Sequence, residues 1–449
     1  MKKSFLIAAF ASVALAVSAQ SSKFFPYPYS VDDLPNGLRL VTVPTDNPKL
    51  VALYLVVRTG SRNEIEPGKS GYAHLFEHMM FRGSEHFTPE QRDEILKRAG
   101  ASANAYTADD RTVYHQLFSK DDLDIVMQLE ADRFQRLSYS PEVYKTETRA
   151  VLGEYNKNSS DPANKLDEVM RATAFHRHTY EHTTMGFIKD IEDMPNQFDY
   201  SRQFYQRYYR PEYTTILMVG DVNREQALSL TKKYFGDWKH GDYTTEIPAE
   251  PPATEARSAH VDWPSPTLPW VVVAFHGPAY SDEQKDKAAL DLLAAIAFGE
   301  TSDLYQRLVL KEQKVDTLAP SFDDAIDPQL FGVYARVKEP KDVDGVRDQV
   351  LATFRRYSTE LVSQQKLDQT RSHLRYGAAL GWSSSNAIAE FLAPYIALRR
   401  TPDTIEKLFA LYNQLTAEDL RNMAARYFTE PNRIIVTLAT KAGNPAGGK

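Results

Sequence analysis

The chain contains the stretch Gly71-Tyr72-Ala73-His74-Leu75-Phe76-Glu77-His78-Met79-Met80-Phe81-Arg82-Gly83, which places two imidazoles and a carboxylate among apolar residues. Residues three and four positions apart share one face of an α-helix, so His74, Glu77 and His78 would lie together on about one and a half turns. Two imidazoles in this arrangement can bind one metal ion, and the carboxylate between them can reach a water on that ion. Bound zinc lowers the pKa of such a water to roughly 7, and a nearby carboxylate can accept its proton. The stretch therefore predicts a buried helix that carries a hydrolytic zinc site.

The pattern His-x-x-Glu-His occurs twice in the chain. The second copy, His178-Thr179-Tyr180-Glu181-His182, lies among Thr, Arg and Tyr residues and has no apolar helical face around it. We expect this copy to be an exposed or partly ordered segment. The first copy could also be a helix whose polar residues merely face solvent, but its neighbours Leu75, Phe76 and Met79 favour burial and a metal site.

A third ligand is expected downstream of the first motif. Ser140 followed by Pro141 predicts the start of a helix. Glu147 and Glu154 follow on this helix, two turns apart and therefore on one face. Both residues could belong to a solvated acidic face, or one could be a metal ligand and the other its helper; the spacing leaves both interpretations open.

The motif His74-x-x-Glu77-His78, followed 76 positions later by Glu154, resembles the pitrilysin or insulinase family of zinc peptidases. The length of the chain is similar to that of the chains in the processing-peptidase-like branch of that family. The resemblance implies that His74, His78 and Glu154 bind Zn²⁺ and that Glu77 is the general base. It makes Glu147 the second expected catalytic carboxylate, either beside the ligands or as an alternate ligand.

Two further stretches carry the same resemblance. Residues 100–114 are similar to the strand pair beside the family's active site, which implies that Asn104 and Ala105 lie on an edge strand that pairs with the substrate backbone. Residues 174–186 are similar to the family's His-Pro-Tyr…Gly segment, with Thr179 where Pro is usual. The fold implied is α+β, with two homologous domains, each an antiparallel sheet with helices packed on one face.

The two halves of the chain look duplicated, but only the first carries the polar motif. The helix that ends at 80–83 recurs 216 positions later at 296–299. At that offset the positions of the two His and the Glu hold Leu290, Leu293 and Ala294. We therefore expect a second domain that keeps the apolar helix and lacks the metal.

The C-terminal half also lacks a substrate-binding pair. Family members that work alone or as two identical chains carry an Arg and a Tyr there, around a stretch resembling Arg-x-Lys-Glu-x-x-x-Tyr. Aligned on Lys311 and Glu312, these two positions hold Val309 and Asp316. The resemblance therefore implies a heterodimer in which a homologous chain without zinc supplies the Arg/Tyr pair. The alternatives are a non-catalytic scaffold subunit and a peptide-binding or chaperone-like protein.

Composition shifts along the chain suggest where the domains begin and end. Lys2 and Lys3 precede a short apolar run, as in a signal peptide, and a Pro-rich stretch follows position 240. Strands expected at 38–43 and 51–57 should pair with each other. We expect a signal peptide at 1–19, a zinc-bearing catalytic domain at 20–240, a linker at 241–265, a homologous domain without zinc at 266–440 and a disordered tail at 441–449.

Charge and cysteine content exclude several classes of protein. The 53 basic and 60 acidic residues give a net charge of −7, and removing Lys2 and Lys3 gives 51 − 60 = −9. This charge argues against nucleic acid and anionic membranes as partners. There is no Cys, and the only long apolar run is too short to span a membrane. The expected signal peptide then places the protein in the periplasm, without a membrane span. The family resemblance implies that it is a zinc metalloendopeptidase that cleaves unfolded peptides.

Overall fold

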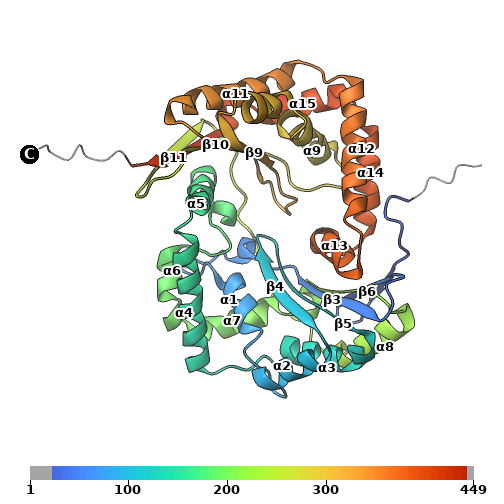
Figure 1. Cartoon of the computed structure of the whole chain (residues 1–449). Coiled ribbons are helices and arrows are strands. Elements are labelled where there is room, and N and C mark those ends of the chain that lie inside the picture. The colour runs from blue at the N-terminus through green and yellow to red at the C-terminus, as the bar shows by residue number, and fades with distance from the viewer. Residues whose placement is uncertain (1–22, 442–449) are drawn as a thin grey trace, which may run out of the picture.

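The computed structural model describes residues 23–441 (Figure 1). The expected signal peptide, and all of the expected C-terminal tail except Lys441, lie outside the described residues. Two β-sheets, one in each half of the chain, organise this part of the molecule. The fold is α+β with two similar domains, as expected.

The first sheet is built around the apolar strand β3 (Leu50–Val57), whose residues from Val51 onward are all buried. The strand order is β1 (Ser30–Asp33), β2 (Arg39–Pro44), β6 (Thr214–Gly220), β3, β5 (Arg111–Ser119) and β4 (Ser102–Ala108). The expected pairing of 38–43 with 51–57 is wrong, because β6 lies between them, parallel to β2 and antiparallel to β3. All seven residues of β6 are buried, which is typical of a strand in the middle of a sheet.

The second sheet has the order β7 (Arg257–Trp263), β11 (Arg433–Thr440), β8 (Trp270–His276), β10 (Leu330–Val337) and β9 (Val315–Ser321). Strands β7 and β11 are parallel, so both sheets are mixed and not purely antiparallel. Strand β7 lies inside the range 241–265 that was expected to be a linker. Within that range, residues 241–256 before β7 and residues 264–265 after it contain no helix or strand.

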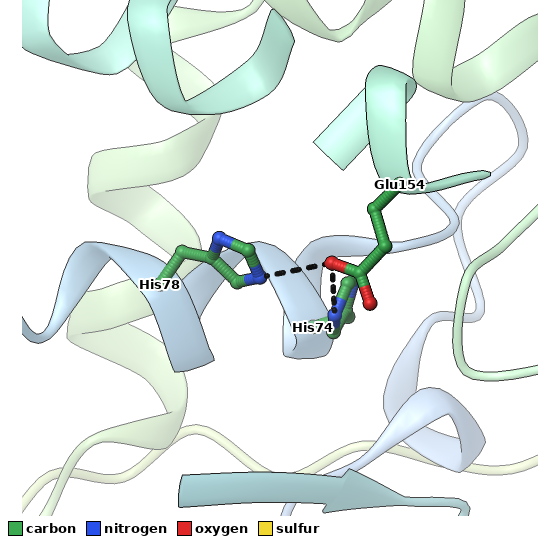
Figure 2. A group of neighbouring side chains, drawn as sticks. All are labelled: His74, His78 and Glu154. Atoms are coloured by element: carbon green, nitrogen blue, oxygen red, sulfur yellow. Dashed lines mark ion pairs between the residues drawn. The ribbon is translucent and has the colours of Figure 1, made fainter. Parts of the chain in front are cut away.

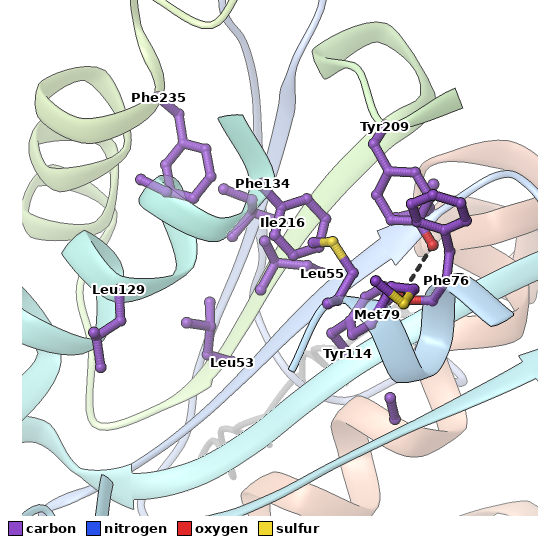
Figure 3. Packing of buried hydrophobic residues seen from close by; sticks show 14 of the residues in the cluster. Leu53, Leu55, Phe76, Met79, Tyr114, Leu129, Phe134, Tyr209, Ile216 and Phe235 are labelled. Atoms are coloured by element: carbon purple, nitrogen blue, oxygen red, sulfur yellow. Dashed lines mark hydrogen bonds between the residues drawn. The ribbon is translucent and has the colours of Figure 1, made fainter. Parts of the chain in front are cut away.

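Most helices of the first half pack their apolar faces on one side of the first sheet. Leu53 and Leu55 of β3 meet Phe76 and Met79 there, together with Phe134, in one buried cluster (Figure 3). The helices are α1 (Tyr72–Met79), α2 (Pro89–Arg98), α3 (Leu123–Gln135), α4 (Pro141–Asn158), α5 (Pro162–Ala174), α6 (Ile188–Asp193), α7 (Phe198–Tyr208) and α8 (Arg224–Phe235).

Most helices of the second half form a similar layer on the second sheet. Leu290 and Leu293 contribute to its core together with Phe331 and Phe354. The helices are α9 (Lys285–Phe298), α10 (Asp303–Tyr305), α11 (Val343–Thr359), α12 (Gln364–Leu380), α13 (Ser385–Arg399), α14 (Asp403–Gln414) and α15 (Ala417–Tyr427), and a π-helical turn spans Gln306–Lys311.

Helices of the same half cover one face of each sheet, as expected, and a helix of the other half covers the remaining face. Helix α13 packs its buried Leu392 and Ile396 on the face of the first sheet that carries Tyr54 and Val56. Helix α5 packs on β7 and β11 of the second sheet (Figure 1). A strand that is apolar on both faces, as β3 is, requires such a second layer. The two halves therefore share their cores.

Candidate metal centre and peptidase site

A buried carboxylate fixes the start of α1, the helix that carries the first motif. Glu64 accepts hydrogen bonds from the backbone N–H groups of Gly71 and Ala73, both at 2.7 Å. Gly71 has a φ of +88°, and a Cβ there would lie 2.7 Å from the carbonyl oxygen of Met185. Burial raises the pKa of Glu64 to about 8, although the N–H donors at the helix start oppose this shift. These contacts determine how the following turns of α1 are oriented.

Helices α1 and α4 bring together the three residues expected to bind metal (Figure 2). The Nε2 atoms of His74 and His78 lie 3.6 and 3.5 Å from Oε2 of Glu154. In a tetrahedral zinc site with bonds of about 2.0–2.2 Å, ligand atoms are about 3.3–3.6 Å apart. One ligand atom from each of the three residues lies within 4.8 Å of the other two. Residues 23–441 contain no other group of three or more His, Asp or Glu side chains with this spacing. The donor set therefore fits zinc.

The two imidazoles differ in their surroundings. Burial lowers the pKa of His74 to about 4, which keeps the ring neutral at neutral pH. A neutral imidazole is the form that binds a metal. The Nδ1 atom of His78 lies 3.8 Å from Oε2 of Glu147. The Glu147 carboxylate raises the pKa of His78.

Glu147 lies behind the three clustered residues and is almost completely buried. Its Oε1 forms an ion pair with Nε of Arg82 at 2.8 Å, whereas its Oε2 is buried and has no hydrogen-bond partner among residues 23–441. The unpartnered oxygen faces Nδ1 of His78, so Glu147 is placed to hold that ring and to increase its basicity.

Glu77 lies on the same helix and contacts the edge strand β4. The hydroxyl of Thr107 donates a hydrogen bond of 2.7 Å to Oε2 of Glu77. Burial raises the pKa of Glu77, although the bond from Thr107 opposes that shift. Glu77 also lines a cavity of about 390 Å³ together with His74 and Glu154. A carboxylate in this position can accept a proton from a molecule bound in the cavity.

The residues expected to bind substrate lie on that same strand. Among the residues that the structure describes, strand β4 pairs only with β5 and is the last strand of its sheet. Asn104 is exposed on it, whereas Ala105 is buried. An edge strand offers unpaired backbone groups to an extended peptide.

The second motif copy is not exposed, contrary to expectation, and does not form a metal cluster. His178 is 2% exposed, and its Nε2 lies 2.9 Å from Oδ2 of Asp327 in the second half. The ring of His182 is hydrogen-bonded through Nδ1 to the carbonyl oxygen of Thr183. Tertiary burial overrides the polar local sequence here, because this segment lies between the two halves.

Sequence reasoning missed the residues that support the site. Glu64, Arg82 and Thr107 carry no spacing pattern that marks them, because each contacts its partner through the fold. All residues that line the 390 Å³ cavity fall between His74 and Met185, within the first half.

Asp316, which stands where the resemblance expects the Tyr of the substrate-binding pair, forms an ion pair with Arg336 at 2.8 Å in the second half.

Comparisons with known proteins agree with this arrangement. The insulinase (peptidase family M16) model matches residues 39–187, and the peptidase M16 inactive domain model matches residues 197–374. The zinc protease PqqE of Helicobacter pylori is 28% identical over 95% of this chain and 96% of its own length. A probable mitochondrial-processing peptidase subunit beta of Arabidopsis thaliana is 26% identical over 88% of this chain and 76% of its own length.

Solved structures show the same fold. A protease from Helicobacter pylori superposes with a TM-score of 0.86 at 27% identity, covering 92% of this chain and 99% of that chain. The periplasmic protease PqqL from Escherichia coli superposes with a TM-score of 0.75 at 20% identity. That match covers 93% of this chain but only 49% of the PqqL chain.

Proposed function

The chain belongs to peptidase family M16, the insulinase family, and from this membership we propose that it is a zinc metalloendopeptidase that hydrolyses unfolded peptides. The proposal rests above all on one observation, the convergence of ligand atoms of His74, His78 and Glu154 to within 4.8 Å of one another, from where they could bind one ion. The similarity to proteins named zinc protease supports it.

In the proposed site, His74, His78 and Glu154 would hold Zn²⁺. When bound, zinc would lower the pKa of a water molecule and polarise the scissile carbonyl group. Glu77 accepts the proton of the attacking water and then delivers it to the nitrogen of the leaving amine. The hydroxyl of Thr107 holds Oε2 of Glu77, so the other oxygen of Glu77 is available for that proton.

The substrate backbone extends along β4, beside Asn104 and Ala105. The raised pKa of Glu77 favours proton acceptance, because a base works best when its pKa is near the working pH. Glu147 acts through His78 and not on the substrate.

The test is the zinc content and peptidase rate of the purified chain and of Glu77→Gln. We expect Glu77→Gln to keep one zinc per chain and to lose hydrolysis, since the substitution removes the base but none of the ligands. Normal turnover of a quenched fluorogenic peptide by Glu77→Gln would refute the assignment of the base. Glu154→Gln should release zinc far more readily than the control Glu181→Gln, which alters the second motif.

We further propose that the chain acts in the periplasm, paired with a homologous chain that carries the Arg/Tyr pair. The Lys-Lys start with its apolar run supports export. No helix among residues 23–441 has the length and apolar character needed to cross a membrane. The match to PqqL covers only 49% of the PqqL chain, so PqqL is about twice as long as the part that this chain resembles. This length supports an assembly in which two chains of this fold pair. A high peptidase rate of the isolated, zinc-saturated chain would contradict the need for a partner.

A scaffold or peptide-binding role is the second candidate, favoured by the match of residues 197–374 to a domain described as inactive. It predicts a chain that protects bound peptide and does not cleave it. Zinc bound at one ion per chain together with cleavage would exclude this role.

A further inference from the structure

The turn between β4 and β5 is held by a loop from the other half of the chain. Residues 322–329 connect β9 to β10, and we refer to them as the β9–β10 loop. The backbone N–H of Ile326 in this loop donates a 2.7 Å hydrogen bond to Oδ2 of Asp110. Nε2 of Gln329 donates to Oδ2 of Asp109 at 3.3 Å. The second half therefore contacts the tip of the hairpin whose first strand is β4.

The same tip is also held from within the first half. The backbone N–H of Arg62 donates to the carbonyl oxygen of Asp109 at 2.8 Å, and the hydroxyl of Tyr180 donates to Oδ1 of Asp110 at 2.7 Å. A Cβ at Gly60 would lie 2.1 Å from the carbonyl oxygen of Ala108, so the turn packs directly on that backbone. Asp110 is 4% exposed and uses one carboxylate oxygen for each half of the chain.

The β9–β10 loop is itself held at its base. Lys287 on α9 is 1% exposed, and its Nζ lies 2.8 Å from Oδ1 of Asp324 and 3.3 Å from the carbonyl oxygen of Phe322. Asp327 further along the loop binds Arg62 and His178, a residue of the second motif copy. A continuous set of contacts thus runs from α9, through the loop and Asp110, to strand β4.

Strand β4 carries two elements of the proposed reaction. It presents the free edge beside Asn104, and it presents Thr107, whose hydroxyl holds Glu77. Thr107 is three residues from Asp110, so a displacement of the turn would shift both elements relative to α1. A held turn would keep the free edge and Thr107 in register with the ligands on α1.

We infer that the second half, which has no cluster of metal-ligating side chains in its described part, positions the substrate-binding strand through its β9–β10 loop, and that Asp110 is the positioning residue at this junction. The inference rests on the proposed peptidase function for its effect on turnover. Its structural part, the control of β4 by the loop, stands apart from that function.

Hydrogen–deuterium exchange of the full chain tests the structural part. We expect Asp110→Asn to increase the exchange rate of amides in 102–108 at least tenfold and to leave 214–220 unchanged. Tyr180→Phe, which removes one of the two donors to Asp110, should give a smaller increase. Asp132→Asn is the matched control, because Asp132 is equally buried and hydrogen-bonded but lies on α3 and binds His86. Exchange in 102–108 that is the same in Asp110→Asn and in the wild type would overturn the inference.

Turnover of a quenched fluorogenic peptide tests the functional part. Asp110→Asn should keep one zinc per chain and reduce kcat/KM at least tenfold, chiefly through a higher KM, while Asp132→Asn stays within twofold of the wild type. Equal KM values for Asp110→Asn and Asp132→Asn would overturn it. Failure of the peptidase proposal has a different signature, namely equal rates for the wild type and Glu77→Gln, and in that case the exchange experiment still decides the role of the loop.

Discussion

At the scale of single residues, one hydroxyl group orients the proposed base. Thr107 donates a hydrogen bond of 2.7 Å to Glu77 from strand β4, which packs beside α1. A hydrogen bond to a charged group contributes roughly 1.5–3 kcal/mol, which corresponds to roughly a 10- to 100-fold change in rate. The orientation of Glu77 therefore depends on a residue of β4.

Thr107→Val removes this hydroxyl and keeps the shape of the side chain. We expect kcat to fall by roughly 10- to 100-fold, with the zinc content unchanged, because Glu77 loses its fixed orientation. Thr107→Ser restores the donor and should recover most of the rate. A Thr107→Val enzyme with wild-type kcat would show that the bond does not matter for turnover.

A second residue-scale prediction concerns Glu147. Its buried carboxylate faces Nδ1 of His78, so Glu147→Gln removes a negative charge that favours binding of a cation. Zinc affinity should fall by roughly 10- to 100-fold, measured by competition with a chelator. Exposed Glu142 lies on the same helix, and Glu142→Gln is the matched control, expected to leave the affinity unchanged.

At the scale of elements, the start of α1 requires glycine at one position. Gly71 has a positive φ, and a Cβ would meet the carbonyl oxygen of Met185, whereas Gly68 has a positive φ of +77° with open space around it. Both Gly→Ala substitutions force a left-handed backbone, which costs about 1–2 kcal/mol. Gly71→Ala should lower the free energy of unfolding by more than Gly68→Ala, as measured by urea titration. Equal losses would mean that the contact with Met185 relaxes freely.

The sequence predicted those elements whose boundaries depend on local chemistry. Ser140 and Pro141 marked the start of α4, and the structure shows the Ser140 hydroxyl accepting from the N–H of Val143. The fully apolar run of β3 could have indicated that both faces of the sheet are covered. The spacing of the first motif identified His74 and His78, which the structure brings together, because residues on one helix depend on helical periodicity alone. Glu154 lies on another helix and was expected from the family resemblance.

Features that depend on distant parts of the chain were not predicted. Strand β6 lies between β2 and β3 although about 160 residues separate it from β3, and no local pattern encodes that insertion. His178 was expected to be exposed, and its burial arises from contact with Asp327. Polar residues that satisfy one another across an interface look like a solvated loop when only the sequence is read.

At the scale of the whole molecule, Asp327 makes the stability of the contact between the two halves depend on pH. Burial opposes its ionisation, but hydrogen bonds from His178 and Arg62 outweigh burial and lower the pKa of Asp327 to about 2, from 3.8. A carboxyl whose pKa is lowered in the folded state adds stability above its unfolded pKa, and that stability is lost as the pH falls through the folded pKa. The contribution is about 2 kcal/mol at neutral pH and disappears between about pH 4 and pH 2.

Asp327→Asn should lower the free energy of unfolding at pH 7 by about 2 kcal/mol and should flatten its decline below pH 4. Urea titrations at pH 7, 5, 4 and 3 measure both effects. The exposed Asp237 provides a control, and Asp237→Asn should follow the wild-type curve. A mutant that loses stability equally at pH 7 and pH 3 would contradict the assigned role.

The shared cores make a prediction for separated halves. A fragment of residues 23–240 lacks α13, so the face of the first sheet that carries Tyr54, Val56 and Leu217 would be uncovered. We expect this fragment to bind a hydrophobic dye and to unfold without a sharp transition. Mixing it with residues 241–441 should restore the cooperative unfolding of the intact chain. A fragment that is monomeric and unfolds cooperatively alone would show that α13 is dispensable.

Because a helix of the second half covers the first sheet, the first half cannot finish folding early in synthesis. The last strand of the first sheet ends at Gly220, but the helix that covers its second face is not complete until Arg399. Throughout the interval a nascent chain displays a wide apolar surface with no partner of its own, and that surface is open to holding chaperones or to aggregation. The ribosome must therefore deliver almost the entire polypeptide before the first half can reach its native state.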